Sequence, residues 1–115
     1  MPIQYASGAH QPDEVLRYSM EFTPGTAIDA SDSLTGDPTV KVYRLPDLLD
    51  VTEDVAGPPA VSGLLVADSD TMSDNVIYAT IHNVVDGTGY KITFRSATTN
   101  GETVEEDLVI YGKSY

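Results

Sequence analysis

The sequence contains no cysteine and little positive charge. Without cysteine, neither a disulfide bond nor a thiolate metal site can form. Only 6 of the 115 residues are Lys or Arg, against 18 Asp or Glu, so the formal net charge is −12. A charge of this sign repels phosphate backbones and anionic lipid headgroups, and we therefore expect neither a nucleic-acid nor a membrane partner.

Long hydrophobic runs are also missing from the sequence. The longest stretch free of charged residues, Val55 to Ala67, is interrupted by Pro58, Pro59 and Gly63. It is shorter than the roughly 20 apolar residues that a membrane-spanning helix needs. Met1 to Pro12 has neither a basic segment nor an apolar one, so we expect no signal peptide. Val, Leu, Ile and Phe still make up 28 of the residues, which suffices for the core of one small domain.

Alternation of apolar and polar residues predicts strands. From Val15 to Phe22 the even-numbered residues are large and apolar, which is the pattern of a strand with one buried face. The same alternation occurs in Thr39–Leu45, Val76–His82, Tyr90–Ser96 and Glu102–Tyr111. No segment longer than about ten residues follows the 3.6-residue period of a helix. We predict an all-β domain over residues 13–115, preceded by an extended arm over residues 1–12 that is free in solution or laid against a neighbour.

Two turn signals indicate the architecture more closely. Asp86-Gly87-Thr88-Gly89-Tyr90 places a tyrosine at the start of the penultimate strand. Immunoglobulin-like sandwiches have a corner tyrosine there, with its hydroxyl bound to upstream backbone, so we expect Tyr90 to bind near Val84–Asp86. Asn100-Gly101 predicts a two-residue hairpin turn, because both turn positions favour positive φ. Together these signals predict an immunoglobulin-like β-sandwich of about seven short antiparallel strands without a disulfide.

Candidate catalytic residues are scattered along the chain. His10 and His82 have no metal ligands at suitable spacing, and we expect His10 in the arm and His82 on a solvated strand face. No serine lies in a Gly-x-Ser-x-Gly motif. In Glu105-Glu106-Asp107, only Glu106 has the parity of the inward residues of its strand, and we expect it at the rim of the sandwich. We predict that the chain is not an enzyme and has no catalytic or cofactor-binding residues.

The acidic loop from Asp68 to Asn75 is the best metal candidate. Three carboxylates within seven residues would supply half of the oxygens that calcium requires. The loop lacks the central glycine and the distal glutamate of an EF-hand, so we favour a turn whose side chains bind their own backbone. We predict no tight calcium site at Asp68, Asp70 and Asp74.

Aromatic and apolar residues at outward positions are candidate partner contacts. Tyr43 and Tyr78 are expected on outward strand faces, where a protein interface or inter-sheet packing is commoner than stacking on a sugar. Ile3 and Tyr5 are the expected anchors of the arm, filling pockets on a neighbouring subunit.

Several phrases of the sequence follow a pattern known from one family. They are Pro12-Asp13-Glu14-Val15-Leu16-x-Tyr18, Ser62-Gly63-Leu64, Val76–Ile81, Gly87-Thr88-Gly89-Tyr90-Lys91-Ile92-Thr93 and Thr98–Glu102. These phrases resemble small structural proteins of tailed bacteriophages, of the type called fibre-tail adaptor proteins. The chain departs from that pattern in Lys41–Pro59, which is longer and more acidic than the family's loop. It also lacks the tryptophans that the family often has near Phe22 and Thr80.

The resemblance implies a virion protein that acts through protein–protein contacts. Its implied role is an adaptor at the neck, tail or fibre attachment, with neck, tail, fibre or capsid subunits as partners and an oligomeric state in the particle. Two alternatives stay open: a capsid decoration protein of the same fold, and a bacterial surface immunoglobulin-like module that binds carbohydrate or calcium.

Overall fold

The computed structural model describes residues 3–5 and 9–114, and this part of the chain contains strands and no helix. The strands are β1 (Ile3–Tyr5), β2 (Leu16–Glu21), β3 (Leu34–Leu45), β4 (Leu49–Asp50), β5 (Thr71–Ser73), β6 (Val76–Ile81), β7 (Gly89–Thr98) and β8 (Thr103–Tyr111). Accordingly, the described residues include no helix long and apolar enough to cross a membrane.

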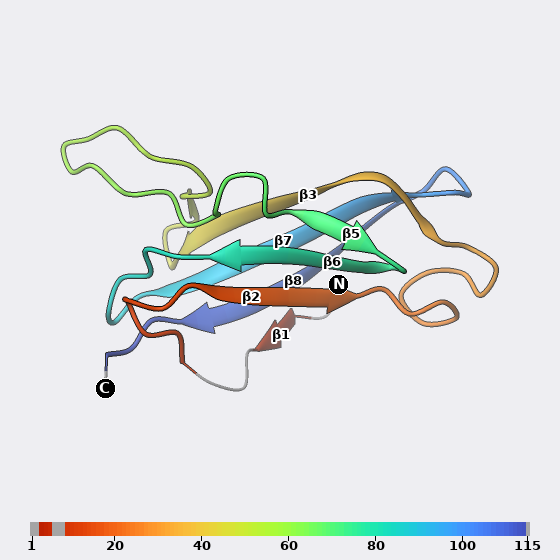
Figure 1. Ribbon diagram of the computed structural model, residues 1–115, viewed down its shortest axis with the longest axis horizontal. Helices are drawn as coiled ribbons and strands as arrows, with labels where there is room; N and C mark the ends of the chain where they lie inside the picture. The colour runs from red at the N-terminus through yellow and green to blue at the C-terminus, as the bar shows by residue number, and fades with distance from the viewer. Residues whose placement is uncertain (1–2, 6–8, 115) are drawn as a thin grey trace.

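The strands form two sheets that lie face to face (Figure 1). One sheet has five strands in the order β1-β8-β7-β3-β4, and the other has three in the order β2-β6-β5. Neighbouring strands are antiparallel, except that β1 runs parallel to β8. The prediction of an all-β chain is confirmed.

Alternating burial along the strands places the core between the two sheets. In β6, Ile77, Ala79 and Ile81 are completely buried, and the residues between them are half-buried. From the opposite sheet, β7 contributes Ile92 and Phe94, which are also completely buried. Each large apolar side chain removed from water stabilises the fold by about 1.5–3 kcal/mol. The two-residue period of the sequence thus identified the buried face of these strands.

Tyr90 joins the start of β7 to the loop before it. Its Oη accepts a hydrogen bond from the Val85 N–H at 3.1 Å, and the side chain is buried. The predicted hydrogen bond between Tyr90 and the Val84–Asp86 backbone is therefore present. Asp86 makes a different contact, because its carboxylate accepts the Ser114 N–H at 2.8 Å.

Tyr90→Phe should lower the free energy of unfolding by about 1–2 kcal/mol, because the Val85 N–H loses its partner. Urea denaturation at neutral pH measures this difference. Tyr43→Phe is the matched control, since the Tyr43 hydroxyl makes no hydrogen bond to the described residues. A loss below about 0.3 kcal/mol in Tyr90→Phe would show that the hydroxyl does not anchor the loop.

The hairpin between β7 and β8 is present, but its turn is one residue longer than predicted. Thr98 N–H binds the Glu102 carbonyl at 2.8 Å and Gly101 N–H binds the Thr98 carbonyl at 3.0 Å, so three residues form the loop. Gly101 has a φ of 86°, whereas Asn100 is not in the positive-φ region. The predicted two-residue Asn100-Gly101 turn is therefore wrong. The physical reason is a tertiary contact, since the Asp32 carboxylate accepts the Asn100 N–H at 3.1 Å and holds it in the loop.

The N-terminal segment pairs with its own chain. β1 lies on the outer side of β8 with Ile3 opposite Asp107 and Tyr5 opposite Val109. The prediction that residues 1–12 form an arm, free or laid against a neighbour, is therefore wrong for Ile3–Tyr5, because this segment pairs with β8 of the same chain. The side chains of Ile3 and Tyr5, expected as partner anchors, lie outside the described part of the structure.

His10 ties this segment to both sheets and is completely buried. Its Nε2 donates to the Glu14 carbonyl oxygen at 2.9 Å, and in the neutral ring its Nδ1 then accepts the Tyr18 hydroxyl, also at 2.9 Å. The His10 backbone bonds to Tyr111 and Lys113, at the end of β8. The expectation that His10 lies in a mobile arm is therefore wrong, because both ring nitrogens find partners inside the fold.

Candidate protein-contact surfaces

Large apolar side chains are exposed at one end of the sandwich. Among the described residues, the large apolar side chains that are more than half exposed are Val15, Leu48, Val85 and Tyr111. Strand register aligns Leu45, Gly89 and Tyr111 in one row across β3, β7 and β8. Leu48 lies in the turn that follows β3, and its N–H bonds to the Arg44 carbonyl. Leu48 and Tyr111 thus share this end.

Val85 and Val15 belong to the same end. Gly112, directly after β8, lies so close to Val85 that an added Cβ would be 2.3 Å from the Val85 carbonyl oxygen. Val15 precedes β2, whose first residue, Leu16, is opposite Ile81 at the last position of β6. In Figure 1 these strand ends and turns all lie toward the left of the molecule. We call Val15, Leu48, Val85 and Tyr111 the apolar end.

A hollow of about 400 Å³ opens beside the apolar end. It is lined by Arg44, Ala60, Val61, Ser62, Asn83, Val84, Val85, Thr88 and Tyr90. Arg44 binds Asp47 through Nη2 at 2.6 Å, and this hydrogen bond raises the pKa of Arg44 and lowers the pKa of Asp47. The charge of Arg44 is therefore balanced at a short distance, and the rest of the lining combines polar with apolar residues.

The opposite end of the sandwich is acidic. Its loops, between β2 and β3, β5 and β6, and β7 and β8, contain Asp29, Asp32, Asp74 and Glu102. None of the six Lys and Arg residues of the sequence falls in these loops. Carboxylates occur at both ends, since Asp13, Glu14, Asp47 and Asp86 lie in loops at the apolar end. The two ends differ because the large exposed apolar side chains gather at the apolar end, whereas the loops of the other end contain no Lys or Arg.

Asp32 connects two loops at the acidic end. Its Oδ1 accepts the Ser33 N–H at 2.8 Å, the Thr99 hydroxyl at 2.6 Å and the Asn100 N–H at 3.1 Å. Desolvation alone raises the pKa of this carboxyl, but the hydrogen bonds from Thr99 and its neighbours outweigh it and lower the pKa below its ordinary value. Asp32 thus helps to hold the β7–β8 hairpin as long as it is ionised.

Asp32→Asn should remove part of the pH dependence of stability. Because the folded-state pKa is lowered, the contribution of Asp32 is complete above its unfolded pKa of about 3.9 and is lost as the pH falls through the folded value. In urea titrations, the difference between wild type and Asp32→Asn should be largest near neutral pH and shrink in acid. Asp29→Asn, an exposed residue of the same loop, is the control. A difference that persists unchanged below about pH 2 would exclude this role.

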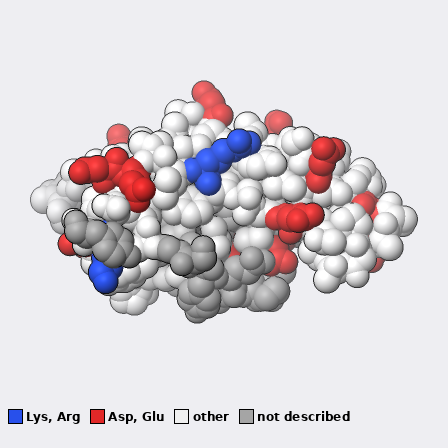
Figure 2. Space-filling view, turned by 60° about the horizontal axis from the view of Figure 1, so that its bottom comes forward, with Lys and Arg blue, Asp and Glu red and all other residues white. Residues whose placement is uncertain are grey.

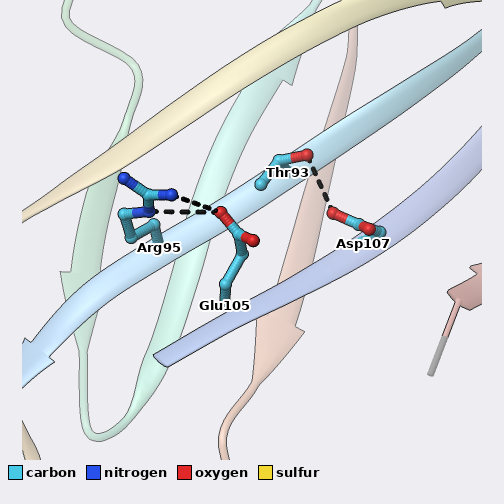
Figure 3. Close-up of polar contacts among 4 residues, drawn as sticks. All are labelled: Thr93, Arg95, Glu105 and Asp107. Atoms are coloured by element: carbon cyan, nitrogen blue, oxygen red, sulfur yellow. Dashed lines mark hydrogen bonds and ion pairs between the residues drawn. The ribbon is translucent and has the colours of Figure 1, made fainter. Parts of the chain in front are cut away.

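The outer face of the five-stranded sheet carries polar pairs between β7 and β8 (Figure 3). Thr93 donates its hydroxyl to Asp107 at 2.8 Å. Arg95 binds Glu105 through Nε and Nη2 at 3.1 and 2.9 Å. These contacts join residues that are opposite each other in register, so they support the strand pairing.

The two tyrosines predicted as partner contacts lie on opposite outer faces of the sandwich. Tyr43 is on the five-stranded sheet, with Lys91 Nζ 5.4 Å from its ring centroid. Tyr78 is on the three-stranded sheet, with Arg17 Cζ 4.0 Å from its ring centroid. Each ring is thus occupied by a cation of its own sheet, and the structure does not bring the two tyrosines into one surface.

The acidic loop from Asp68 to Asn75 forms a turn and the short strand β5. Ser69 donates its hydroxyl to the Val66 carbonyl at 2.7 Å, in the manner of a turn that binds its own backbone. His82 is half-buried, at a hollow that Asp68 and Asp70 also line. Within residues 3–5 and 9–114, no three His, Asp or Glu side chains are grouped to hold a metal ion. The absence of a tight calcium site stays a prediction.

Glu106 is more deeply buried than its sequence position indicated. Only 8 % of the residue is exposed, and its Oε2 has no hydrogen-bond partner among the described residues. Burial raises the pKa of this carboxyl, the positive charge of the N-terminus opposes the shift in part, and the neighbouring Asp107 adds to it. The expected position at the rim is corrected, although the inward parity of Glu106 was a signal for its burial.

Comparisons of the chain with models of protein families, with curated proteins and with solved structures found no match.

Proposed function

We propose that the chain is a non-enzymatic structural protein of a tailed-bacteriophage virion, where it joins other virion proteins at the neck, tail or fibre attachment. The observation that carries this proposal is that the large exposed apolar side chains of the described residues gather at one end of the sandwich, whereas the loops of the other end hold carboxylates and no Lys or Arg. Buried apolar contacts dominate the stability of protein interfaces, whereas charges select partners and orientation. Two chemically different ends therefore suit a module that holds two partners in a fixed direction.

The strand order supports an immunoglobulin-like sandwich as the architecture of this adaptor. The sheet β2-β6-β5 has the order of strands B, E and D in that fold, and β8-β7-β3-β4 has the order G, F, C and C′. Tyr90 begins β7, which takes the place of strand F, where the corner tyrosine of such domains occurs.

Two of the sequence phrases that resemble phage adaptor proteins border the apolar end, whereas a third, Thr98–Glu102, lies at the acidic end. The phrase from Pro12 to Tyr18 includes Val15 and leads into β2. The phrase from Gly87 to Thr93 contains the loop before β7 and Tyr90 itself. We assign the apolar end to the main virion partner, because the large exposed apolar side chains of the described residues gather there.

The experiment follows incorporation of the chain into particles of the phage that encodes it. Val85→Asn and Tyr111→Thr remove exposed apolar surface, so they should leave the unfolding midpoint in urea unchanged. Incorporation, measured by mass spectrometry of purified virions, should fall by about tenfold or more if each contact contributes like an interface hot spot. Ala30→Asn, an exposed change in the β2–β3 loop at the acidic end, is the control.

Two results would overturn the proposal. Purified virions that lack the chain altogether would exclude a structural role in the particle. Full incorporation of the Val85 and Tyr111 variants would exclude the apolar end as the contact surface.

A further inference from the structure

One edge of β2 has backbone groups that no described residue binds. β2 pairs with β6 on one side, and Phe22 N–H continues that antiparallel ladder to the Asn75 carbonyl at 2.8 Å. Backbone groups in a strand point alternately to its two sides, so the even-numbered residues of β2 point toward β6. The residues whose N–H and C=O groups point to the open edge are Arg17, Ser19 and Glu21.

The five-stranded sheet extends beyond β2 on this side of the molecule. β2 lies over β8, because Tyr18 of β2 binds His10, which pairs with Gly112 at the end of β8. β1 is attached to the outer side of β8 and therefore lies past β2, as Figure 1 shows. The five-stranded sheet thus continues past the open edge of β2.

A buried carboxyl lies on the inward face of β8, in the sheet that faces β2. Glu106 is on the inward face of β8, with the same parity as Leu108, and 8 % of it is exposed. Its Oε2 lacks a partner among the described residues. A buried carboxylate gains most from a cationic hydrogen-bond donor, since the pair then replaces the lost contacts with water.

The charge of the molecule favours a cationic occupant at this edge. The chain has a net charge of −12. Figure 2 brings the side with β1 and β2 toward the viewer and shows more acidic than basic surface there. Arg17 is the cation on β2, and its guanidinium lies over the Tyr78 ring. A segment rich in Lys or Arg is therefore attracted to this side, whereas a second copy of the chain is repelled.

We propose that the open edge of β2 accepts an extended, basic segment of a partner protein as an added antiparallel strand. The segment's backbone bonds to Arg17, Ser19 and Glu21, and one inward Lys or Arg side chain pairs with Glu106. Binding by strand addition takes its affinity from main-chain hydrogen bonds and its specificity from alternate side chains. The inference rests on the proposed adaptor function and names the chemistry of one of its partners.

Synthetic peptides of about seven residues test this inference, since a strand of this length matches β2. The probe alternates Thr and Val and has one Lys in place of a central Val; a matched peptide has Glu there. We expect the Lys peptide to slow hydrogen exchange of the Arg17, Ser19 and Glu21 amides. It should bind about tenfold or more tightly than the Glu peptide by fluorescence anisotropy, and Glu106→Gln should reduce this preference.

Ser19→Pro is the decisive protein variant. It removes an N–H that points away from β6, and proline is tolerated on the open side of an edge strand. Ser19→Pro should therefore abolish peptide binding while Ser19→Ala retains it. A Lys peptide that is N-methylated at the positions facing β2 should also fail to bind, which tests the same bonds if Ser19→Pro does not fold.

Three results would overturn the inference: equal binding to Ser19→Pro and Ser19→Ala, exchange protection located elsewhere, or concentration-dependent dimers that protect the same amides. Particle incorporation separates this inference from the proposed function. If Ser19→Pro is incorporated normally while the Val85 and Tyr111 variants are not, the adaptor role stands and the added strand is excluded. If virions lack the chain, the adaptor role fails, and peptide binding alone then decides whether the edge accepts a strand.

Discussion

Gly112→Ala should destabilise the chain by about 3 kcal/mol, at the upper end of the effects of overpacking. A Cβ at this position would lie 2.3 Å from the Val85 carbonyl oxygen and 2.5 Å from Val84 Cγ1. No real Cβ approaches a backbone atom so closely, so the loop before β7 must move. Gly112 also exchanges hydrogen bonds with Gly87 and Thr88, and these bonds would be strained by the movement. Urea denaturation measures the loss.

Gly87→Ala is the control for this experiment. Gly87 has a φ of 80°, but no atom lies within 4 Å of the Cβ position. Its substitution should therefore cost only the conformational penalty of a left-handed alanine, about 1–2 kcal/mol. Equal effects of the two substitutions would mean that the close contact between Gly112 and Val85 does not exist. Val85 would then no longer be placed at the apolar end by its closeness to Gly112.

His10→Ala should also destabilise the chain by about 3 kcal/mol. The substitution leaves a cavity in place of a completely buried ring. It also leaves the Tyr18 hydroxyl and the Glu14 carbonyl without their partner. Burial raises the pKa of Tyr18 to about 12, and the negative charge of Glu14 adds to this shift. Thermal and urea unfolding measure the destabilisation.

His82→Ala provides the matched control, since His82 is half-buried and its side chain makes no hydrogen bond to the described residues. We expect an effect below about 0.5 kcal/mol there. A His10→Ala variant as stable as the wild type would show that residues 1–12 form an arm that does not stabilise the domain.

The sequence by itself determined the class of the fold and the buried face of its main strands. In β6 and β7, the two-residue alternation directly encodes which side chains face the opposite sheet, because successive residues of a strand point to opposite sides. The hydrogen bond of Tyr90 was predictable for a similar reason. Its donor, Val85, is five residues away, so a local turn is sufficient to bring the two groups together.

Only the tertiary structure decided the features that join distant segments. Asp32 determines the length of the β7–β8 loop from 68 residues away, and the parallel pairing of β1 with β8 joins the two ends of the chain. Neither contact has a local pattern in the sequence, because each depends on where the sheets bring the loops. His10 was misplaced for this reason, since a histidine in a polar segment shows no periodicity.

The tertiary structure also determined which residues form the candidate contact surface. The tyrosines predicted from outward parity, Tyr43 and Tyr78, are covered by cations of their own sheets. The exposed apolar residues instead lie in turns and at strand ends, where parity carries no information about exposure. These residues are exposed because the start of β2, the turn after β3, the loop before β7 and the end of β8 all lie at one end of the sandwich. The sequence determines the strands, whereas the assembly of the two sheets determines which of their ends a partner can reach.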